Sequence, residues 1–331
     1  MSRPLLLPAP AKLNLYLRIL GRRADGFHEL ETLFERIDLA DELTFRDADD
    51  AITLTCSDPA LSCAADNLVV KAAALLQRSA KTQQGASIHL TKRTPVGAGL
   101  GGGSSDAATT LIGLNRLWQL QLPISQLKEL AAELGSDVAF FLEQQAFAIG
   151  TGRGERLEPL PDLSATLWHV LVVPTQRLST ADIYAGYAAA RATPNGAPPS
   201  VGAAGRSSWR GSALSGSTVA ESRLTETGPS LTMTVHALRN GPDLSGLAAG
   251  LWNTLEPEAI RRCPAIQDIR NFLRNNGCVG WLTSGSGSAV FGLCRNKDHV
   301  QQVADRVRAD GSRDWQVIVV RTFSGRVDER G

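Results

Sequence analysis

The residues of this chain that most clearly carry chemistry form a glycine-rich stretch, Pro-Val-Gly-Ala-Gly-Leu-Gly-Gly-Gly-Ser-Ser, at positions 95–105. Ordering glycine costs more backbone entropy than ordering any other residue, so this density indicates a backbone that must curl closely around a ligand. Apolar residues at helical spacing follow at Leu111, Leu114 and Leu117, and Ser and Asp residues before them favour a helix start near Ser104. A glycine loop leading into a helix N-terminus offers free N–H donors and the positive end of the helix dipole. The stretch therefore predicts an anion site, most simply a phosphate site.

Two common phosphate loops do not account for this stretch. Gly97, Gly99 and Gly102 match G-x-G-x-x-G, but a dinucleotide-binding fold needs an acidic residue on a second strand about 20 residues later. Here residues 123–134 have the pattern of another helix. The loop G-x-x-x-x-G-K-[S/T] ends in Lys followed by Ser or Thr, and this stretch contains no lysine. Both are rejected.

A strand with alternating apolar and polar residues is predicted at residues 11–19. Its polar face begins with Lys12 and Asn14 and continues with Tyr16 and Arg18. We expect Tyr16 and Arg18 to face solvent. For Lys12 and Asn14, the spacing alone also favours a solvated face over a chemical role.

Three further features have both a chemical and a structural interpretation. Asp137 follows Gly135, a suitable helix C-cap, and could act chemically or cap the short apolar helix after it. Phe27 and His28 end a turn and could be local packing. The Gly-Ser stretch at residues 284–288 is typical of a hairpin, but beside an independent phosphate loop it favours a shared cleft.

Length and composition set broad limits on the class of protein. A chain of 331 residues with 43% hydrophobic residues predicts two domains, since single cores seldom grow past about 250 residues. The 34 Lys and Arg residues against 33 Asp and Glu residues provide no basic field for nucleic acid. The five cysteines form no C-x-x-C pair, which argues against a zinc site and a disulfide framework. No apolar run approaches a membrane span, so we expect a cytoplasmic protein without a nucleic-acid or membrane partner.

Alternating strands and helices must position these residues. Strands are expected near residues 11–19, 32–39, 43–45, 52–56, 87–90, 167–173, 277–283, 289–294 and 315–320. Helices are expected near residues 68–78, 104–118, 123–134, 179–187, 243–252, 264–275 and 299–308. Residues 192–230 are rich in Gly, Ser, Ala, Pro and Thr and have few large apolar residues, which predicts a disordered insertion.

Four separated segments together resemble the GHMP kinases. They are Pro-Ala-Lys-Leu-Asn-Leu at 10–15, the glycine stretch extended to 95–108, Gly-Ser-Asp-Val-Ala-Phe-Phe at 135–141, and Ser-Gly-Ser-Gly-Ser-Ala-Val-Phe at 284–291. Gly-Phe-His at 26–28 narrows the resemblance to members that act on a cytidyl substrate. The resemblance covers the chain from residue 8 to about residue 320, apart from the insertion.

This resemblance implies an α+β fold of two domains. The N-terminal domain, residues 1–163, is expected to be like ribosomal protein S5 domain 2 and to bind ATP. The C-terminal domain, residues 164–331, is expected to be ferredoxin-like and to carry the insertion at 192–230. The acceptor is expected between the two domains.

The activity that the resemblance implies is an ATP-dependent phosphotransfer to an alcohol. The γ-phosphoryl group of ATP would move to the 2-hydroxyl of 4-diphosphocytidyl-2-C-methyl-D-erythritol, in the non-mevalonate pathway to isoprenoid precursors. Two alternatives stay open. A GHMP kinase for homoserine, mevalonate or a sugar would share the loop but should lack Gly-Phe-His. A non-catalytic nucleotide-binding homologue is the other, although the presence of both Lys12 and Asp137 argues against it.

Roles for single residues also follow from the resemblance. Lys12 and Asp137 are the expected catalytic residues, with Asp137 as the base that accepts the hydroxyl proton. Either Ser104 or Ser105 is expected to contact Mg²⁺. The expected acceptor-binding residues are Asn14, Phe27, His28 and Tyr184, with the rings of Phe27 and Tyr184 on opposite faces of the cytosine. The expected ATP-binding residues are Pro95, Val96, Gly97, Ala98, Gly99, Leu100, Gly101, Gly102, Gly103, Ser104 and Ser105.

Overall fold

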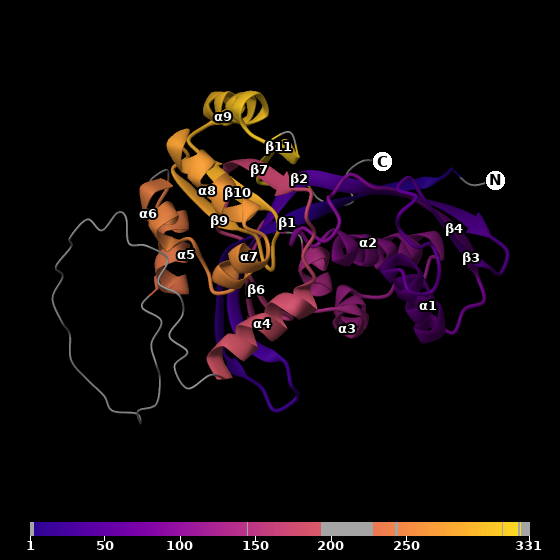
Figure 1. Ribbon diagram of the computed structural model, residues 1–331. Helices are drawn as coiled ribbons and strands as arrows, with labels where there is room; N and C mark the ends of the chain where they lie inside the picture. The colour runs from indigo at the N-terminus through magenta and orange to yellow at the C-terminus, as the bar shows by residue number, and fades with distance from the viewer. Residues whose placement is uncertain are drawn as a thin grey trace.

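The computed structural model describes residues 3–143, 145–192, 228–241, 244–312, 314–323 and 325. Most of the insertion predicted at 192–230 lies outside these described residues. Figure 1 shows a long sheet built by the N-terminal part of the chain and, at one end of it, a smaller sheet built by the C-terminal part. The predicted boundary at residue 163 falls between β6 (Arg156–Pro159) and β7 (Trp168–Pro174) and stays a prediction.

The secondary structure elements follow the alternation expected from the sequence. Up to the predicted boundary they are β1 (Leu5–Arg22), β2 (His28–Ala48), β3 (Ile52–Cys56), α1 (Leu68–Ala80), β4 (Gly85–Thr91), α2 (Gly102–Leu117), α3 (Ile124–Leu134), the 3₁₀ helix η1 (Val138–Leu142), β5 (Phe147–Gly152) and β6. After it come β7, α4 (Thr180–Ala192), α5 (Leu231–Arg239), α6 (Leu244–Gly250), β8 (Trp252–Asn253), α7 (Glu256–Arg262), α8 (Ala265–Asn275), β9 (Gly280–Thr283), β10 (Val290–Cys294), α9 (Lys297–Asp310) and β11 (Trp315–Arg321).

The larger sheet contains seven strands within the described residues, five of them in the order β3-β4-β2-β1-β8. β1 and β2 form a long antiparallel pair whose register places Lys12 opposite Arg36 and Asn14 opposite Phe34. One end of β2 pairs with β5 and the other with β4. The short strand β8, from the second half of the chain, lies parallel to β1. Both halves of the chain therefore contribute to this sheet.

The smaller sheet has the strand order β11-β7-β10-β9 among the described residues, and all neighbouring strands are antiparallel. Counted from β7 along the chain, this is the 4-1-3-2 order of a β-α-β-β-α-β, ferredoxin-like unit. The helices α8 and α9 contribute Ile269, Leu273, Val300 and Val303 to the apolar cluster against this sheet. The expected ferredoxin-like architecture of the C-terminal part is confirmed.

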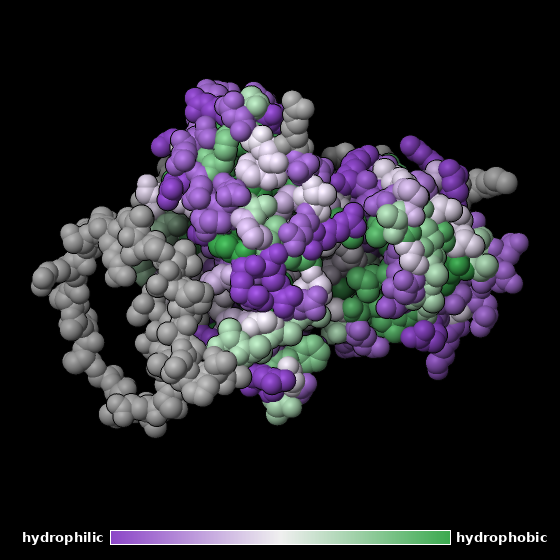
Figure 2. Space-filling view, in the orientation of Figure 1, coloured by the Kyte–Doolittle hydropathy of each residue, from purple (hydrophilic) through white to green (hydrophobic). Residues whose placement is uncertain are grey.

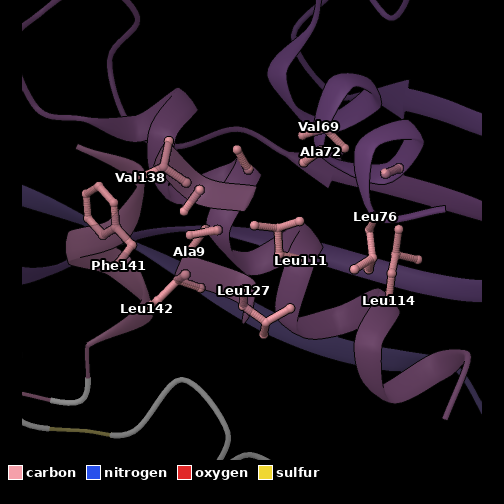
Figure 3. Packing of buried hydrophobic residues seen from close by; sticks show 14 of the residues in the cluster. Ala9, Val69, Ala72, Leu76, Leu111, Leu114, Leu127, Val138, Phe141 and Leu142 are labelled. Atoms are coloured by element: carbon pink, nitrogen blue, oxygen red, sulfur yellow. The ribbon is translucent and has the colours of Figure 1, made fainter. Parts of the chain in front are cut away.

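Strand β1 contributes residues to two separate clusters of the apolar core. One cluster joins the larger sheet to α1, α2, α3 and η1, and Figure 3 shows Leu127 beside Leu142 of η1, with Ala9 of β1 between Leu111 and Phe141. A second cluster combines Leu13 of β1 with Leu171 of β7 and Phe291 of β10. On the face shown in Figure 2, apolar residues gather over α1 to α3, whereas hydrophilic residues cover α9.

Tyr16 corrects the expectation of a solvated polar face on β1. Its side chain is fully buried, and its hydroxyl lies within hydrogen-bond distance of Glu31 Oε1 at 3.0 Å and of the Pro229 carbonyl oxygen at 3.1 Å. Burial, together with the negative charge of Glu31, raises the pKa of Tyr16. Arg18 is partly buried and donates to the same Pro229 oxygen at 2.9 Å. The end of the predicted insertion, residues 228–230, is thus packed against β1.

Three secondary structure predictions are also corrected. The two strands predicted at residues 32–39 and 43–45 are parts of the single 21-residue strand β2. Helices α5 and α7, nine and seven residues long, lie where the sequence pattern predicts no helix. Helix α2 begins at Gly102 rather than near Ser104.

Candidate active site

The glycine stretch forms a loop between β4 and α2 whose backbone requires glycine at three points. Gly97, Gly99 and Gly101 have φ angles of 69°, 79° and 70°, in the left-handed region that side chains rarely adopt. Gly99 also lies so close to the second glycine loop that an added Cβ would be 2.1 Å from the Ser284 carbonyl oxygen. Because Gly101 serves as the N-cap of α2 without any side-chain bond, Ser104 and Ser105 fall inside the first helical turns.

The loop directs its carbonyl groups into the protein and leaves its amides free. Each of five consecutive carbonyl oxygens accepts one hydrogen bond. The donors are Leu178 N to Gly97 (3.4 Å), Ala289 N to Ala98 (3.1 Å), Ser284 Oγ to Gly99 (3.0 Å), Lys12 N to Leu100 (2.9 Å) and Ser105 N to Gly101 (2.9 Å). Among the described residues, no acceptor pairs with the N–H groups of these same five loop residues. Free amides next to a helix N-terminus are a ready anion site, as the sequence predicts.

One cavity of about 990 Å³ brings the predicted site residues together. Its lining includes Lys12, Asn14, Phe27, His28, Asp137, Tyr184 and all of residues 95–104. Ser105 is the exception, because it does not line the cavity and its buried Oγ has no hydrogen-bond partner among the described residues. Gly285 and Ser286 of the second glycine loop also line it, so the expected shared cleft is confirmed.

Lys12 and Asp137 face each other in this cavity. Lys12 is 4% exposed, and its Nζ lies 3.4 Å from Asp137 Oδ2 and donates to Asn14 Oδ1 at 2.5 Å. Asn14 is oriented in turn by donating from Nδ2 to Thr32 Oγ1 at 2.8 Å. Asp137 is the N-cap residue of η1 by position, but its side chain makes no capping bond. Its carboxylate is therefore available to the cavity, with one-third of the side chain exposed.

The second glycine loop supports this pair from the other side. Ser284 Oγ donates to Gly99 O at 3.0 Å and lies 3.3 Å from the Asn14 amide nitrogen, whose N–H it accepts. An added Cβ on Gly285 would lie 3.1 Å from Asn14 Oδ1 and 3.4 Å from Lys12 Nζ. The stretch connects β9 to β10, as a hairpin does, and it also lies against Asn14 and close to Lys12.

The aromatic residues that line the cavity contact neighbouring side chains. The His28 ring lies 5.3 Å from the Tyr184 ring, whereas the Arg153 guanidinium lies 4.8 Å over the Phe27 ring. Phe27 is 53% exposed. Burial, together with the positive charge of Arg22, lowers the pKa of His28. Tyr184 thus contacts His28, and the stacking of Phe27 and Tyr184 on a cytosine stays a prediction.

A buried charge cluster beside the glycine loop was missed by sequence reasoning, and two of its members, Lys92 and Asp106, line the cavity. Lys92 Nζ lies 2.5 Å from Asp41 Oδ2 and 2.6 Å from Asp106 Oδ2, and Asp41 Oδ1 accepts from the Thr94 amide at 2.7 Å. Burial, with a contribution from Asp41, raises the pKa of Asp106 to about 7 although Lys92 opposes the shift. The cluster ties β2, the end of β4 and the first turns of α2 together. The wide separation of its members in the sequence left no local signal for it.

The described part of the chain shows no dedicated metal cage and no membrane-spanning helix. No group of three or more His, Cys, Asp and Glu side chains in it could hold a metal ion. None of its helices is both long and apolar enough to cross a bilayer.

Comparison with known proteins places this geometry in a family. The family described as GHMP kinases N terminal domain matches residues 67–145, and GHMP kinases C terminal matches residues 234–313. Proteins called 4-diphosphocytidyl-2-C-methyl-D-erythritol kinase are similar over nearly the whole chain. The one from Pelotomaculum thermopropionicum is 38% identical, over 96% of this chain and 98% of its own. The one from Shouchella clausii is 35% identical, over 96% of this chain and 94% of its own length.

A solved structure gives the same result in three dimensions. The crystal structure of a 4-(cytidine 5'-diphospho)-2C-methyl-D-erythritol kinase matches with a TM-score of 0.71 and 34% identity, covering 96% of this chain and 99% of that one. The expected two-part GHMP kinase fold is thus confirmed. The chain belongs to the GHMP kinases and, within them, to the family of 4-diphosphocytidyl-2-C-methyl-D-erythritol kinases.

Proposed function

We propose that this protein transfers the γ-phosphoryl group of ATP to the 2-hydroxyl of 4-diphosphocytidyl-2-C-methyl-D-erythritol, on the non-mevalonate route to isoprenoid precursors. The observation that carries the proposal is the Lys12–Asp137 pair, 3.4 Å apart, in the same cavity as the glycine loop. The Gly-Phe-His segment at residues 26–28 lines that cavity as well. The similarity to kinases of that name extends over nearly the full chain.

The residues present are suited to in-line phosphoryl transfer. Asp137 would accept the acceptor's hydroxyl proton while the oxygen–phosphorus bond forms and ADP leaves. Lys12, held by Asn14, would stabilise the negative charge on the transferring oxygens. The free amides of the loop would bind the phosphates of ATP.

Mg²⁺ fits this site as an ion that arrives with ATP. It prefers oxygen ligands and is usually bound by substrate phosphates plus one or two protein oxygens rather than by a protein cage. Ser104 lines the cavity, whereas Ser105 is buried outside its lining. We therefore propose Ser104 rather than Ser105 as the hydroxyl ligand. When bound, the ion would neutralise phosphate charge.

The proposed activity is tested by an ATP-consumption assay with the cytidyl acceptor, run beside homoserine, mevalonate and galactose. Of these four acceptors, we expect only the cytidyl acceptor to give saturable release of ADP from ATP. The product should show a new phosphate monoester signal in ³¹P NMR. Turnover of another alcohol instead would replace the substrate assignment. ATP binding without turnover of any acceptor would favour a non-catalytic nucleotide-binding protein.

The phosphate loop should not tolerate a side chain at Gly101. Its φ of 70° is strained for a β-branched residue, and an added Cβ would lie 3.0 Å from both Lys12 Cγ and Phe141 Cζ. We expect Gly101→Val to weaken ATP binding at least tenfold, a loss of about 1.4 kcal/mol or more, while the far-UV circular dichroism spectrum is retained. Calorimetric titration with ATP measures the affinity. Gly21→Ala, where an added Cβ meets nothing within 4 Å, serves as control. Unchanged ATP affinity in the valine variant would reject the loop as the nucleotide site.

Phe27 should contribute to acceptor binding and not to ATP binding. Its exposed ring can stack on a cytosine face, and one such stack is worth about 1–3 kcal/mol. We therefore expect Phe27→Ala to weaken binding of the cytidyl acceptor about tenfold and to leave ATP affinity unchanged. Separate calorimetric titrations with the two ligands measure this. Leu20→Ala removes another exposed apolar side chain from the same hairpin, outside the cavity lining, and is the matched control. If acceptor affinity survives in the Phe27 variant, the ring serves only in packing.

A further inference from the structure

The helix that follows Asp137 is held at both ends by cations from one cross-strand pair. Lys12 of β1 and Arg36 of β2 are directly opposite in the antiparallel register. Opposite residues of such a pair project to the same face of the sheet, so both side chains extend toward η1. Lys12 reaches the Asp137 carboxylate just before the first residue of η1. Arg36 reaches the other end.

Arg36 binds the backbone at the C-terminal end of η1. Its Nη2 donates to the Phe140 carbonyl oxygen at 3.1 Å and to the carbonyl oxygen of Glu143, the C-cap residue. The guanidinium also lies 5.5 Å over the Phe140 ring, which stacks on the ring of Phe34 at 4.8 Å. The Phe140 oxygen also accepts from the Glu143 amide at 3.1 Å, and a cation beside the carbonyl end of a helix interacts favourably with the negative end of its dipole.

Packing alone does not account for an arginine at this position. Arg36 is fully buried, and its Nε and Nη1 have no hydrogen-bond partner among the described residues. Burial lowers the pKa of the guanidinium to about 10 against the opposing charge of Glu143, so it is a cation at neutral pH. A buried charge with unsatisfied donors destabilises a fold, and an apolar residue of similar size is often neutral or stabilising in its place.

We propose that Arg36 is a positioning residue for phosphoryl transfer, which holds η1 from its C-terminal end and so sets the Asp137 carboxylate against Lys12. The proposal rests on the role of Asp137 as the base put forward above. A general base must lie within hydrogen-bond reach of the proton it takes, and a misplacement of about 1 Å can lower turnover about 100-fold. Because η1 is only five residues long, a shift at its C-terminal end is felt at Asp137.

The apolar side of η1 keeps this segment folded independently of Arg36. Val138, Phe141 and Leu142 are at most 4% exposed, and they pack in one cluster with Leu111 of α2 and Leu127 of α3, as Figure 3 shows. Such contacts are non-directional, whereas the hydrogen bonds from Arg36 fix the carbonyl positions. Removing the guanidinium should therefore loosen the placement of η1 without unfolding it.

The first measurement is steady-state kinetics of Arg36→Met with ATP and the cytidyl acceptor. We expect kcat to fall roughly 10- to 30-fold, the KM for ATP to change less than about twofold, and the melting temperature to stay the same or rise. Arg36→Lys keeps a cation in reach of the two carbonyls and should restore part of kcat. Lys128→Met is the matched control, because Lys128 contacts the same residue, Glu143, only through its side chain at 2.6 Å. It should keep full activity.

A double-mutant cycle with Asp137→Asn separates positioning from a general structural effect. If Arg36 acts through Asp137, Arg36→Met should cost no further turnover in the Asp137→Asn background. An equal loss in both backgrounds would overturn the proposal, as would full kcat in Arg36→Met. If the methionine variant does not fold, the same cycle is run with Arg36→Lys. If the wild-type protein is inactive on the cytidyl acceptor, the substrate assignment is refuted but the proposed role of Arg36 is not. The double-mutant cycle is then measured with the alcohol that the wild-type protein does phosphorylate.

Discussion

Replacing Asp137 with asparagine is expected to lower kcat by about 10² to 10⁴, the range usual for loss of a general base. Asparagine keeps the shape of the side chain but cannot accept the acceptor's hydroxyl proton. The effect should fall on turnover, because the glycine loop that would bind ATP is a separate element of the cavity. Initial-rate measurements over a range of both substrates give kcat and the two KM values, and the KM values should change little.

Stability measurements distinguish this role from the capping role that the sequence left open. The Asp137 side chain makes no capping bond to η1, so the melting temperature of Asp137→Asn should stay close to that of the parent. Asp162→Asn, which alters a surface ion pair with Arg239, is the control for a neutralised aspartate outside the cavity. A variant of Asp137 that is fully active but clearly less stable would instead support capping.

Lys12→Met is expected to lower kcat by about 10² or more, if the ammonium stabilises charge that develops on the transferring oxygens. Methionine retains the long apolar stem that packs beneath Gly101, where an added Cβ would meet Lys12 Cγ at 3.0 Å. It removes the group that lies 3.4 Å from Asp137 and 2.5 Å from Asn14. The loss is therefore electrostatic rather than one of volume.

The distribution of the Lys12 effect between kcat and KM decides its role. A fall in kcat with a nearly unchanged KM indicates an interaction made in the transition state. A rise in the KM for the acceptor with kcat preserved would make Lys12 a binding residue only. Lys297→Met, an exposed lysine in the first turn of α9, is the control and should behave like the parent protein.

The glycine loop could be predicted from sequence because its backbone conformation imposes a local pattern. Three positive φ angles within five residues require glycine at alternate positions, and this density is visible without any structure. The different positions of Ser104 and Ser105 could not be predicted, because both are ordinary residues of the first helical turns. Only the rotation of α2 about its axis places one on the cavity and the other in the core.

The burial of Tyr16 illustrates what an alternating pattern leaves open. Period-two alternation separates the two faces of β1, but it does not say what covers the polar face. In this fold the segment before α5 returns to that face, and the Pro229 carbonyl oxygen meets the Tyr16 hydroxyl. The two residues in that contact are 213 positions apart, so no local sequence pattern predicts it. The same is true of Arg36, whose partners lie more than 100 positions away.

The carbonyl bonds of the glycine loop have a consequence for how this protein can evolve. Of the five groups that donate to the loop carbonyls, Leu178 N, Ser284 Oγ and Ala289 N belong to the second half of the chain, and Lys12 N and Ser105 N belong to the first. The glycine loop is therefore held in place by both halves of the chain rather than by one of them alone. An insertion or deletion between β9 and β10 would move the anchors of the phosphate loop even though that turn is about 185 positions distant in sequence. Changes in the hairpin around Phe27 leave these anchors in place, whereas the turn at residues 284–288 must retain its length for the glycine loop to keep its shape.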